Sequence, residues 1–290
     1  MPELPEVETT VRDLNKKVLG RTFVDIWTDF KNVVKKPKSF EEFKNQIRGR
    51  KIRRVWRRGK NILLALSEDK TLLIHQKLTG HLLLGEWVKK KEGWQVKTPG
   101  PLAEDPMNRF LHLIFWLDNG QMLALSDLRK FAKVELLDKD TLEKELISFG
   151  PEPLEKDFTF EKFKGCFKSK KGKIKQVLMD QTVIAGIGNI YSDEVLWEAK
   201  IHPFKEVSNL SEVELKKIYM AIKKILPLAI ELKGESFSDF RRLSGEKGYF
   251  DKARKVYRRA GEKCSRCGTI IKKGKIAGRS THFCPKCQKI

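Results

Sequence analysis

The sequence predicts a multidomain α+β protein: a leading helix with antiparallel strands, then a helical region, then a small cysteine-rich segment. Three observations support this prediction. Short apolar stretches separated by turn residues fill the first half of the chain, and helical periodicity replaces them in the second half. Four of the five cysteines lie in the last 27 residues. A chain of 290 residues is long enough for two domains and one small module.

The first helix is predicted to begin within the first few residues. Apolar residues recur with the spacing of one helical face: Val7, Val11, Leu14 and Val18. Glu3, Glu6 and Glu8 lie at its start, where the positive end of the helix dipole favours acidic side chains. Gly20 follows and is the residue type that commonly ends a helix.

Antiparallel strands are predicted after this helix, up to about residue 137. The candidate strands are residues 61–66, 71–78, 81–84, 111–117 and 122–125. The turn Asp118-Asn119-Gly120 joins the last two as a hairpin. Residues 86–107 are rich in Lys, Gly and Pro and interrupt the strands, so we interpret them as a loop or hairpin insertion.

A domain boundary is predicted at the run SFGPEPLEKD, residues 148–157, where the strand pattern gives way to a helical one. The candidate helices are residues 160–166, 174–181, 191–199 and 211–232. Ser211 and Glu214 begin the last of these as a capping box. We therefore expect a domain over 1–137, a linker over 138–158, a helical domain over 159–262 and a cysteine module over 263–290.

The charge of the chain favours a polyanionic partner. Lys and Arg total 60 against 38 Asp and Glu, a formal net charge of +22, and the isoelectric point is near 9.7. Residues 241–290 contain 16 bases and 3 acids, and residues 48–60 contain eight bases and no acid. Two basic runs far apart in sequence favour one shared nucleic-acid surface over an anionic membrane. No apolar run is long enough to span a bilayer and no signal peptide is evident, so we expect a soluble intracellular protein.

The clearest local motif is a pair of Cys-x-x-Cys knuckles separated by sixteen residues. Its cysteines are Cys264, Cys267, Cys284 and Cys287. Two thiolate pairs can close a tetrahedral zinc site, and the metal then supplies folding energy to a segment with few large apolar residues. A redox role is the weaker alternative, because thioredoxin-like motifs occur singly. Four thiolates fill the coordination sphere, so we predict one structural zinc ion per chain.

The other end of the chain contains a candidate nucleophile. Removal of Met1 would expose the secondary amine of Pro2, with Glu3 beside it and Glu6 one turn along. An N-terminal amine has a reference pKa of about 7.7–8.0 and is partly neutral, whereas a lysine at about 10.4 is almost wholly protonated. The helix dipole disfavours a positive charge at this end, and the carboxylates favour it. The alternative interpretation is that these are ordinary first-turn residues.

Six short motifs resemble the formamidopyrimidine-DNA glycosylase family, in family order and over essentially the whole chain. They are PELPEVET at 2–9, RGK at 58–60, HQKLTG at 75–80, DLRKF at 127–131, DQTVIAGIGNIY at 180–191, and the cysteine module with GRST at 278–281. The resemblance implies an N-terminal β-sandwich with a leading helix, a helix–two-turns–helix domain that binds DNA, and a C-terminal zinc finger. It also implies that a loop near 234–249 caps the damaged base, and the chain departs from the family there at Glu235-Ser236-Phe237.

The resemblance assigns roles at the reacting centre. It implies that Pro2 is the nucleophile, Glu3 the general acid and base, and Glu6 a supporting residue. The amine would displace the base and hold the sugar as an iminium, an electron sink that eases later proton loss and strand cleavage. Lys60 and Arg279 are implied to assist catalysis by holding the phosphates at the lesion.

DNA contacts are likewise implied by the resemblance. The implied DNA-binding residues are His75, Leu78, Arg129, Phe131, Asn189 and Arg279. An extruded base leaves a hole in the duplex, and Leu78, Arg129 and Phe131 would fill it. Leu78 stands where methionine is usual and keeps its volume and apolarity. Lys130 stands where arginine is usual and keeps the charge without the bidentate fork.

These features predict a bifunctional DNA glycosylase and AP lyase of base excision repair, acting on duplex DNA. It would excise 8-oxoguanine and formamidopyrimidines and nick the strand by β,δ-elimination. The PELPEVET start and the Arg129-x-Phe131 pair favour this over an endonuclease VIII-like enzyme for oxidised pyrimidines. The intact Pro2-Glu3 start argues against a non-catalytic zinc-ribbon protein that binds damaged DNA. We further expect a monomer in the cytoplasm, associated with the nucleoid, with no organic or redox cofactor.

Overall fold

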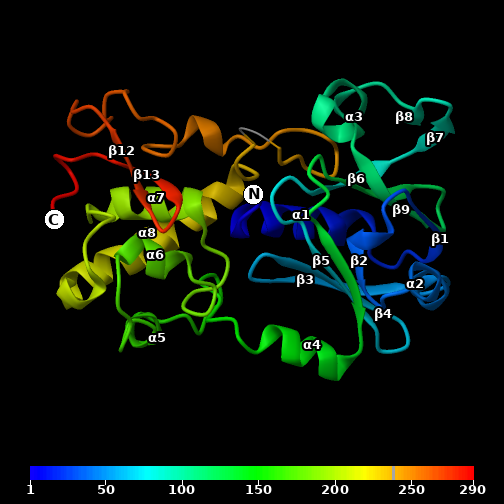
Figure 1. Ribbon diagram of the computed structural model, residues 1–290, viewed down its shortest axis with the longest axis horizontal. Coiled ribbons are helices and arrows are strands. Elements are labelled where there is room, and N and C mark those ends of the chain that lie inside the picture. The colour runs from blue at the N-terminus through cyan, green and yellow to red at the C-terminus, as the bar shows by residue number, and fades with distance from the viewer. Residues whose placement is uncertain (237–238) are drawn as a thin grey trace. The chain divides into compact units, whose positions relative to one another are not determined.

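The computed structural model describes residues 1–236 and 239–290, and its chain divides into two compact units (Figure 1). Unit 1 contains Met1–Ile147 and Leu232–Asp251, and unit 2 contains Ser148–Glu231 and Lys252–Ile290. Unit 1 is therefore discontinuous in sequence. Within the described residues, no helix is both long and apolar enough to cross a membrane.

Unit 1 opens with helix α1 (Leu4–Lys17), whose N-cap is Glu3. The apolar face predicted from the sequence is buried, with Val7 and Leu14 completely inaccessible. Gly20, just beyond the helix, has a φ of 81°, a conformation that glycine adopts without steric cost. The predicted leading helix is confirmed.

Two sheets form the sandwich of unit 1. The four-stranded sheet has the order β1 (Phe23–Thr28), β9 (Leu111–Leu117), β10 (Met122–Ser126) and β6 (His81–Gly85). The five-stranded sheet has the order β2 (Val34–Lys36), β11 (Lys133–Leu137), β5 (Thr71–His75), β4 (Asn61–Leu66) and β3 (Ile52–Arg58). One core cluster contains alternate residues of both sheets, such as Phe115 and Leu64, together with Val7 of α1. The sheets therefore pack face to face, with α1 closing the core.

Short helices cover the rest of unit 1. They are η1 (Lys31–Val33), α2 (Phe40–Ile47) and α4 (Lys139–Leu146). Phe43 of α2 contacts Phe115, with ring centroids 6.3 Å apart. Leu142 and Leu146 of α4 pack on Leu73, on the face of the five-stranded sheet that points away from the sandwich core.

The insertion predicted over 86–107 is an ordered structure. It contains β7 (Trp87–Lys90), β8 (Gly93–Val96), α3 (Pro101–Glu104) and the 3₁₀ helix η2 (Pro106–Arg109). Strands β7 and β8 pair as a separate hairpin. Trp94 packs edge-on against Trp27 and Trp116, at centroid distances of 5.1 and 5.7 Å. These three rings attach the insertion to the outer face of the four-stranded sheet.

Unit 2 consists of helices and one hairpin. Its elements are α5 (Phe160–Gly165), α6 (Ile174–Met179), α7 (Asn189–Ala199), η3 (Val207–Asn209), α8 (Glu212–Glu231), β12 (Lys272–Ile276) and β13 (Arg279–Phe283). The 3₁₀ helix η4 (Phe250–Lys252) spans the second boundary between the units, where the chain returns from unit 1 to unit 2. The predicted capping box is present, because Ser211 Oγ accepts from the N–H of Glu214 and the Ser211 N–H donates to the Glu214 carboxylate (3.2 and 3.0 Å). Helix α7 contacts α6, α8 and β13, so most of its side chains are buried.

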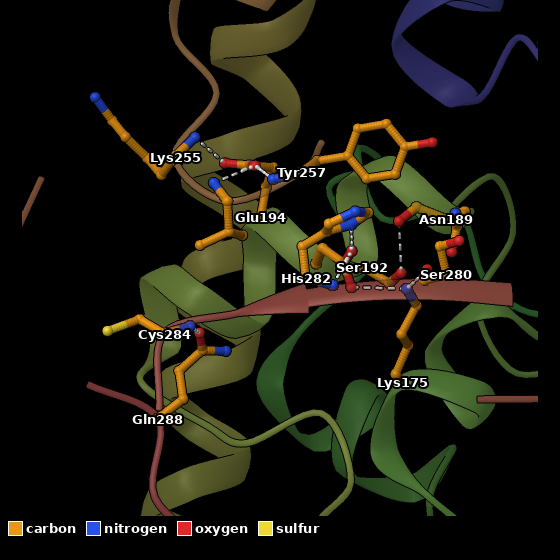
Figure 2. Close-up of polar contacts among 12 residues, drawn as sticks. Lys175, Asn189, Ser192, Glu194, Lys255, Tyr257, Ser280, His282, Cys284 and Gln288 are labelled. Carbon is orange, nitrogen blue, oxygen red and sulfur yellow. Dashed lines mark hydrogen bonds and ion pairs between the residues drawn. The ribbon is translucent and has the colours of Figure 1, made fainter. Parts of the chain in front are cut away.

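A buried ion pair attaches the hairpin to the helices (Figure 2). Lys175 Nζ donates to Asp193 Oδ1 at 2.7 Å and to the carbonyl of Ser280 at 2.8 Å. The N–H of His282 donates to Asp193 Oδ2 at 2.9 Å. Both side chains of the Lys175–Asp193 pair are completely buried. Charges removed from water persist only when they are paired and hydrogen-bonded, so this network fixes β13 on α6 and α7.

A second carboxylate of α7 holds the segment that precedes the cysteine module. Glu194 accepts hydrogen bonds from the N–H groups of Lys255, Val256 and Tyr257 at 2.8, 3.0 and 2.8 Å (Figure 2). Burial raises the pKa of Glu194 in spite of these three donors. Arg266 of the module stacks on Trp197, with its guanidinium carbon 3.8 Å from the ring centroid. The cysteine module is thus attached to α7 at several points.

The domain boundaries differ from those expected from the sequence in two respects. Helix α4 lies in the predicted linker 138–158, and the segment Leu232–Asp251, inside the predicted helical domain, packs with unit 1. The physical reason for the second difference is the burial of Leu243 in the core of unit 1. The apolar residues of this segment, such as Phe240, Leu243 and Phe250, follow no clear helical or strand period, so the sequence gives no signal for such a return.

We expect Lys175→Met to destabilise the zinc-loaded protein by about 3–5 kcal/mol, because it leaves the Asp193 carboxylate buried without its cation. Urea unfolding measures the effect. Lys164→Met, which removes an exposed partner of Glu212, is the control and should leave the unfolding midpoint nearly unchanged. Equal midpoints for the two variants would show that the buried pair does not hold unit 2 together.

Candidate active site and metal centre

The start of α1 is fixed by a carboxylate whose two oxygens are both engaged. Glu6 Oε2 accepts from the N–H of Glu3 in a reciprocal capping box, and Glu6 Oε1 accepts from the N–H of Glu235, each at 2.7 Å. Glu3 and Glu6 are each 1% exposed, and Pro2 is also buried. Gly234, at a φ of 80°, lies so close that a side chain there would collide with Glu6. The candidate nucleophile and both candidate carboxylates therefore lie together.

Residues 235–237, where the sequence departs from the family, begin at the contact between Glu235 and Glu6. Ser236 Oγ accepts from the N–H of Gly248 at 2.8 Å, and Glu235 and Ser236 are buried. Phe237 lies outside the described residues. The base of the predicted capping loop is therefore packed on α1.

Lys60 lies in the turn between β3 and β4, next to Gly59. Arg57 fixes this turn, because its guanidinium donates to the Gly59 carbonyl at 3.0 Å and to the Glu8 carboxylate of α1 at 3.2 Å. Lys60 is only 6% exposed, so it is not an ordinary exposed lysine at a strand edge. The Glu8–Arg57 pair joins the Lys60 turn to the helix that carries Pro2.

His75 ends β5 and pairs in register with Asn61, the residue after Lys60. The N–H of Lys77 donates to His75 Nδ1 at 2.9 Å, which places the ring proton of the neutral form on Nε2. Burial, with the nearby charges of Lys77 and Lys60, lowers the pKa of His75 to about 3. At neutral pH this side chain can donate one hydrogen bond to a DNA oxygen but contributes no charge.

Two loops carry the predicted plug residues, and Asp127 joins them. The hydroxyl of Thr79 donates to Asp127 Oδ1, and the N–H of Arg129 donates to Thr79 Oγ1 at 3.1 Å. Asp127 Oδ2 accepts from the N–H of Ala132 at 2.8 Å. Leu78, on one loop, and Arg129, on the other, are therefore supported by the same carboxylate.

The plug side chains are accessible above this support. Phe131 is 50% exposed, and the Arg129 guanidinium lies 4.7 Å from the centroid of its ring. Leu78 is half-buried. Lys130, with a φ of 56°, places its ammonium 5.4 Å from the ring centroid of Phe30. The lysine that replaces the usual arginine thus contacts an aromatic ring of its own unit.

Asn189 is the first residue of α7 in unit 2. Gln181 organises the glycine turn before it, accepting from the N–H of Gly186 and donating to the carbonyl of Ile187, both at 2.8 Å. Asn189 Oδ1 is buried and has no hydrogen-bond partner among the described residues. The N-cap is Gly188, and the first turn of α7 contains no acid, so this helix start suits an anion.

Arg279 begins β13 at a tight turn. Ala277 and Gly278, the two residues of the turn, have φ values of 46° and 76°, the signs that a type I′ hairpin requires. Arg279 itself is exposed. Because Ser280 and His282 of the same strand are bound to the Lys175–Asp193 pair, the exposed guanidinium stands on a fixed hairpin.

The four predicted zinc ligands converge on one point. Their Sγ atoms all lie within 4.8 Å of one another, with Cys264–Cys287 at 4.0 Å and Cys267–Cys284 at 3.5 Å. Four sulfurs at about 2.3 Å from a tetrahedral zinc ion are about 3.8 Å apart, so the cluster fits this metal. The Cys284 N–H donates to the side chain of Gln288 at 2.9 Å (Figure 2). Gln288 in turn donates to the carbonyl of residue 201, just after α7, at 2.9 Å.

The predicted site residues fall into two groups. Unit 1 contains Pro2, Glu3, Glu6, Lys60, His75, Leu78, Arg129 and Phe131, and unit 2 contains Asn189, Arg279 and the four cysteines. The residues that support them, Asp127, Gln181 and Asp193, were not among the site residues predicted from the sequence. Asp127 and Gln181 lie inside two of the six family motifs, so their place in the sequence was a signal, whereas Asp193 follows its motif and gave none.

Family models match three parts of the chain. They are the formamidopyrimidine-DNA glycosylase N-terminal domain over residues 1–134, its H2TH domain over 149–241, and the zinc finger found in FPG and IleRS over 261–290. The match to the last model and the convergence of the four sulfurs identify a structural zinc site.

Curated relatives named formamidopyrimidine-DNA glycosylase match the chain from end to end. The protein from Herpetosiphon aurantiacus is 38% identical over 99% of this chain and 100% of its own length. The protein from Streptococcus mutans is 40% identical, with 100% of both chains covered.

Solved structures of DNA complexes are also similar to this chain. A variant of Lactococcus lactis FPG with Fapy-dG-containing DNA has a TM-score of 0.86 and 36% identity, with both chains covered completely. Lactococcus lactis Fpg with abasic-site DNA has the same TM-score of 0.86 and 36% identity, covering 99% of this chain and 100% of that one. MutM with DNA containing carbocyclic 8-oxo-G has a TM-score of 0.85 and 37% identity over both full chains. Sequence, fold and the arrangement of the site together place this chain in the formamidopyrimidine-DNA glycosylase family.

Proposed function

We propose that this chain is a bifunctional DNA glycosylase and AP lyase that excises oxidised purines from duplex DNA and then nicks the strand. The observation that carries the proposal is the start of α1, where Pro2, Glu3 and Glu6 are buried together. Full-length relatives named formamidopyrimidine-DNA glycosylase support it. Solved complexes of similar proteins with Fapy-dG, 8-oxo-G and abasic DNA support the choice of substrate.

In the proposed reaction, removal of Met1 exposes the amine of Pro2, which is the nucleophile. The nitrogen attacks the anomeric carbon of the damaged nucleoside, the glycosidic bond breaks, and the base leaves with the bonding electrons and takes up a proton. Opening of the sugar ring gives an iminium between Pro2 and the sugar. Loss of a proton beside the iminium expels one phosphate, and a second elimination expels the other.

The two carboxylates take different parts in this proposal. Both oxygens of Glu6 already accept backbone N–H groups, so Glu6 acts as a positioning residue that fixes the helix start. Glu3 is the residue beside the amine, and we assign to it the proton transfers of ring opening and elimination. The nearby Lys60, fixed through Arg57 and Glu8, would hold a phosphate next to the lesion.

The remaining residues have two proposed roles: some bind phosphates, and others fill the space left by the extruded base. Arg279 on the anchored hairpin and Asn189 at the start of α7 would grip phosphates. Leu78, Arg129 and Phe131, supported by Asp127, would occupy the space left by the extruded base. Duplex DNA as substrate would place the enzyme at the nucleoid, and we expect it to act as a monomer.

Blocking the Pro2 amine should abolish both reactions. Retaining Met1, or adding a tag before it, converts the secondary amine to an amide whose lone pair is delocalised and cannot form an iminium. Borohydride should trap processed protein on abasic DNA, with the sugar on the N-terminal peptide in mass spectrometry. A protein tagged at the C-terminus is the control and should remain active. Full activity with Met1 retained, or an adduct on an internal lysine, would contradict the mechanism.

Removal of either of the two proposed phosphate-binding bases, Lys60 or Arg279, should reduce the salt dependence of DNA binding. Lys60→Met, which keeps the packed stem, and Arg279→Ala should each make the negative slope of log K against log salt shallower by about 0.9. Asn189→Ala removes no charge, so it should weaken binding at an unchanged slope. Lys97→Ala, on the insertion, is the control for loss of charge elsewhere. Unchanged slopes for Lys60→Met and Arg279→Ala would exclude them as phosphate contacts.

Loss of the plug should affect excision more than strand cleavage at an abasic site. Base extrusion costs a few kcal/mol, so Arg129→Ala or Phe131→Ala should lower excision from duplex DNA by about tenfold or more. Cleavage of a preformed abasic site should change much less. Leu128→Ala removes a comparably exposed apolar side chain from the same loop and serves as the control. Equal losses in both reactions would assign Arg129 and Phe131 to the fold instead.

A further inference from the structure

The insertion between β6 and β9 contacts the segment Leu232–Asp251, although more than 120 residues separate them in sequence. Both belong to unit 1. The segment includes the predicted capping loop, of which the structure describes residues 234–236 and 239–249. No motif of the sequence assigned a role to the insertion.

An ion pair forms the first contact. Arg241 Nε donates to Asp105 Oδ2 at 2.6 Å, and their side chains are 4% and 14% exposed. Asp105 Oδ1 accepts from the N–H of Met107 at 3.0 Å, so the carboxylate also caps η2 of the insertion. Burial opposes the charge of Asp105, yet Arg241 and the Met107 N–H hold its pKa below its ordinary value. Each oxygen of this carboxylate therefore has a defined donor.

An amide forms the second contact. Asn108 is 2% exposed, and its Nδ2 donates to the carbonyl of Pro101 at 2.8 Å and to that of Gly245 at 3.2 Å. Gly245 has a φ of 81°, and a side chain built there would lie 2.7 Å from Asn108 Nδ2 and 2.8 Å from the backbone of Leu102. Only glycine permits this close approach of the segment to the insertion.

The segment is attached to unit 1 at two further points. The N–H of Leu84 in β6 donates to the carbonyl of Leu243 at 2.8 Å, and Leu243 is buried in the sandwich core. At the other end, the N–H of Glu235 donates to Glu6 at 2.7 Å. The segment therefore extends from the helix that carries the proposed nucleophile to the insertion.

We propose that the insertion is a positioning element for recognition of the damaged base. Asp105 and Asn108 fix residues 241–245, and these fix the loop that faces an extruded base. This inference rests on the proposed function, because it assigns the loop to the recognition of an oxidised purine. An abasic site presents no base, so the insertion should matter for excision and not for cleavage of abasic DNA.

The insertion is itself packed against the four-stranded sheet. Trp94 holds its hairpin on the sheet through Trp27 and Trp116, and Leu102 of α3 belongs to the same apolar cluster. A displacement of about 1 Å at a substrate-positioning residue can cost about 10²-fold in rate. Loss of the Asp105–Arg241 or Asn108–Gly245 contact is therefore sufficient to change the rate of base removal.

The experiment compares two single-turnover rates for each variant: excision from duplex DNA containing formamidopyrimidine, and cleavage of the same duplex with an abasic site. We expect Asp105→Asn and Asn108→Ala each to lower the excision rate by roughly 10- to 100-fold, with abasic cleavage within about twofold of the unmodified protein. Asp105→Glu, which keeps the charge, should recover part of the excision rate. Glu86→Gln, which removes an exposed ion pair in the same insertion, is the matched control and should change neither rate.

The outcomes separate this inference from the proposed function. An unmodified protein that processes neither substrate refutes the proposed function. Given an active unmodified protein, equal changes in the two rates, whether both fall or neither does, overturn the positioning role. Because Asp105→Asn and Asn108→Ala remove different contacts with the segment, either variant decides the question if the other does not fold.

Discussion

The geometry of the candidate active site depends on the carboxylate of Glu6. One oxygen closes the capping box at the start of α1, and the other accepts the N–H of Glu235 from a distant part of the chain. A buried carboxylate with a missing donor is costly, so both contacts must form together. This single side chain therefore fixes the direction in which the chain enters α1. It also fixes the point at which the segment Leu232–Asp251 contacts the start of that helix.

Buried carboxylates recur as connectors throughout this basic protein. Asp127 joins the two loops of the plug, Asp105 joins the insertion to the capping segment, and Asp193 and Glu194 join the C-terminal module to α7. Each accepts hydrogen bonds from backbone N–H groups, side-chain donors or both. These few carboxylates therefore act as structural anchors of the fold. The net charge of +22 still favours a polyanionic partner, because bases outnumber acids by 60 to 38.

Local patterns in the sequence predicted local structure well. The spacing of Val7, Val11 and Leu14 predicted α1, the Ser211–Glu214 box predicted the start of α8, and the two knuckles predicted the convergence of four sulfurs. Long-range contacts could not be predicted in this way. The pairing of Arg241 with Asp105 joins residues 136 apart in sequence, and neither residue lies in a periodic or motif context. The same limitation explains why the insertion was interpreted only as a loop or hairpin, since the three-tryptophan contact that attaches it to the sheet exists only after the sheet has formed.

The discontinuity of unit 1 bears on the order of events during synthesis. Glu6 and Glu235 are 229 residues apart, and all of Ser148–Glu231 is translated between them. At about 5–20 residues per second, the ribosome needs roughly 10 to 50 seconds to bring the second partner to the first. During this interval the nascent N-terminal segment lacks the hydrogen bond between Glu235 and Glu6 that is present in the finished unit. The late arrival of Glu235 therefore leaves the start of the chain without this contact for most of its synthesis, and the removal of Met1 that the proposed mechanism requires would fall in that interval.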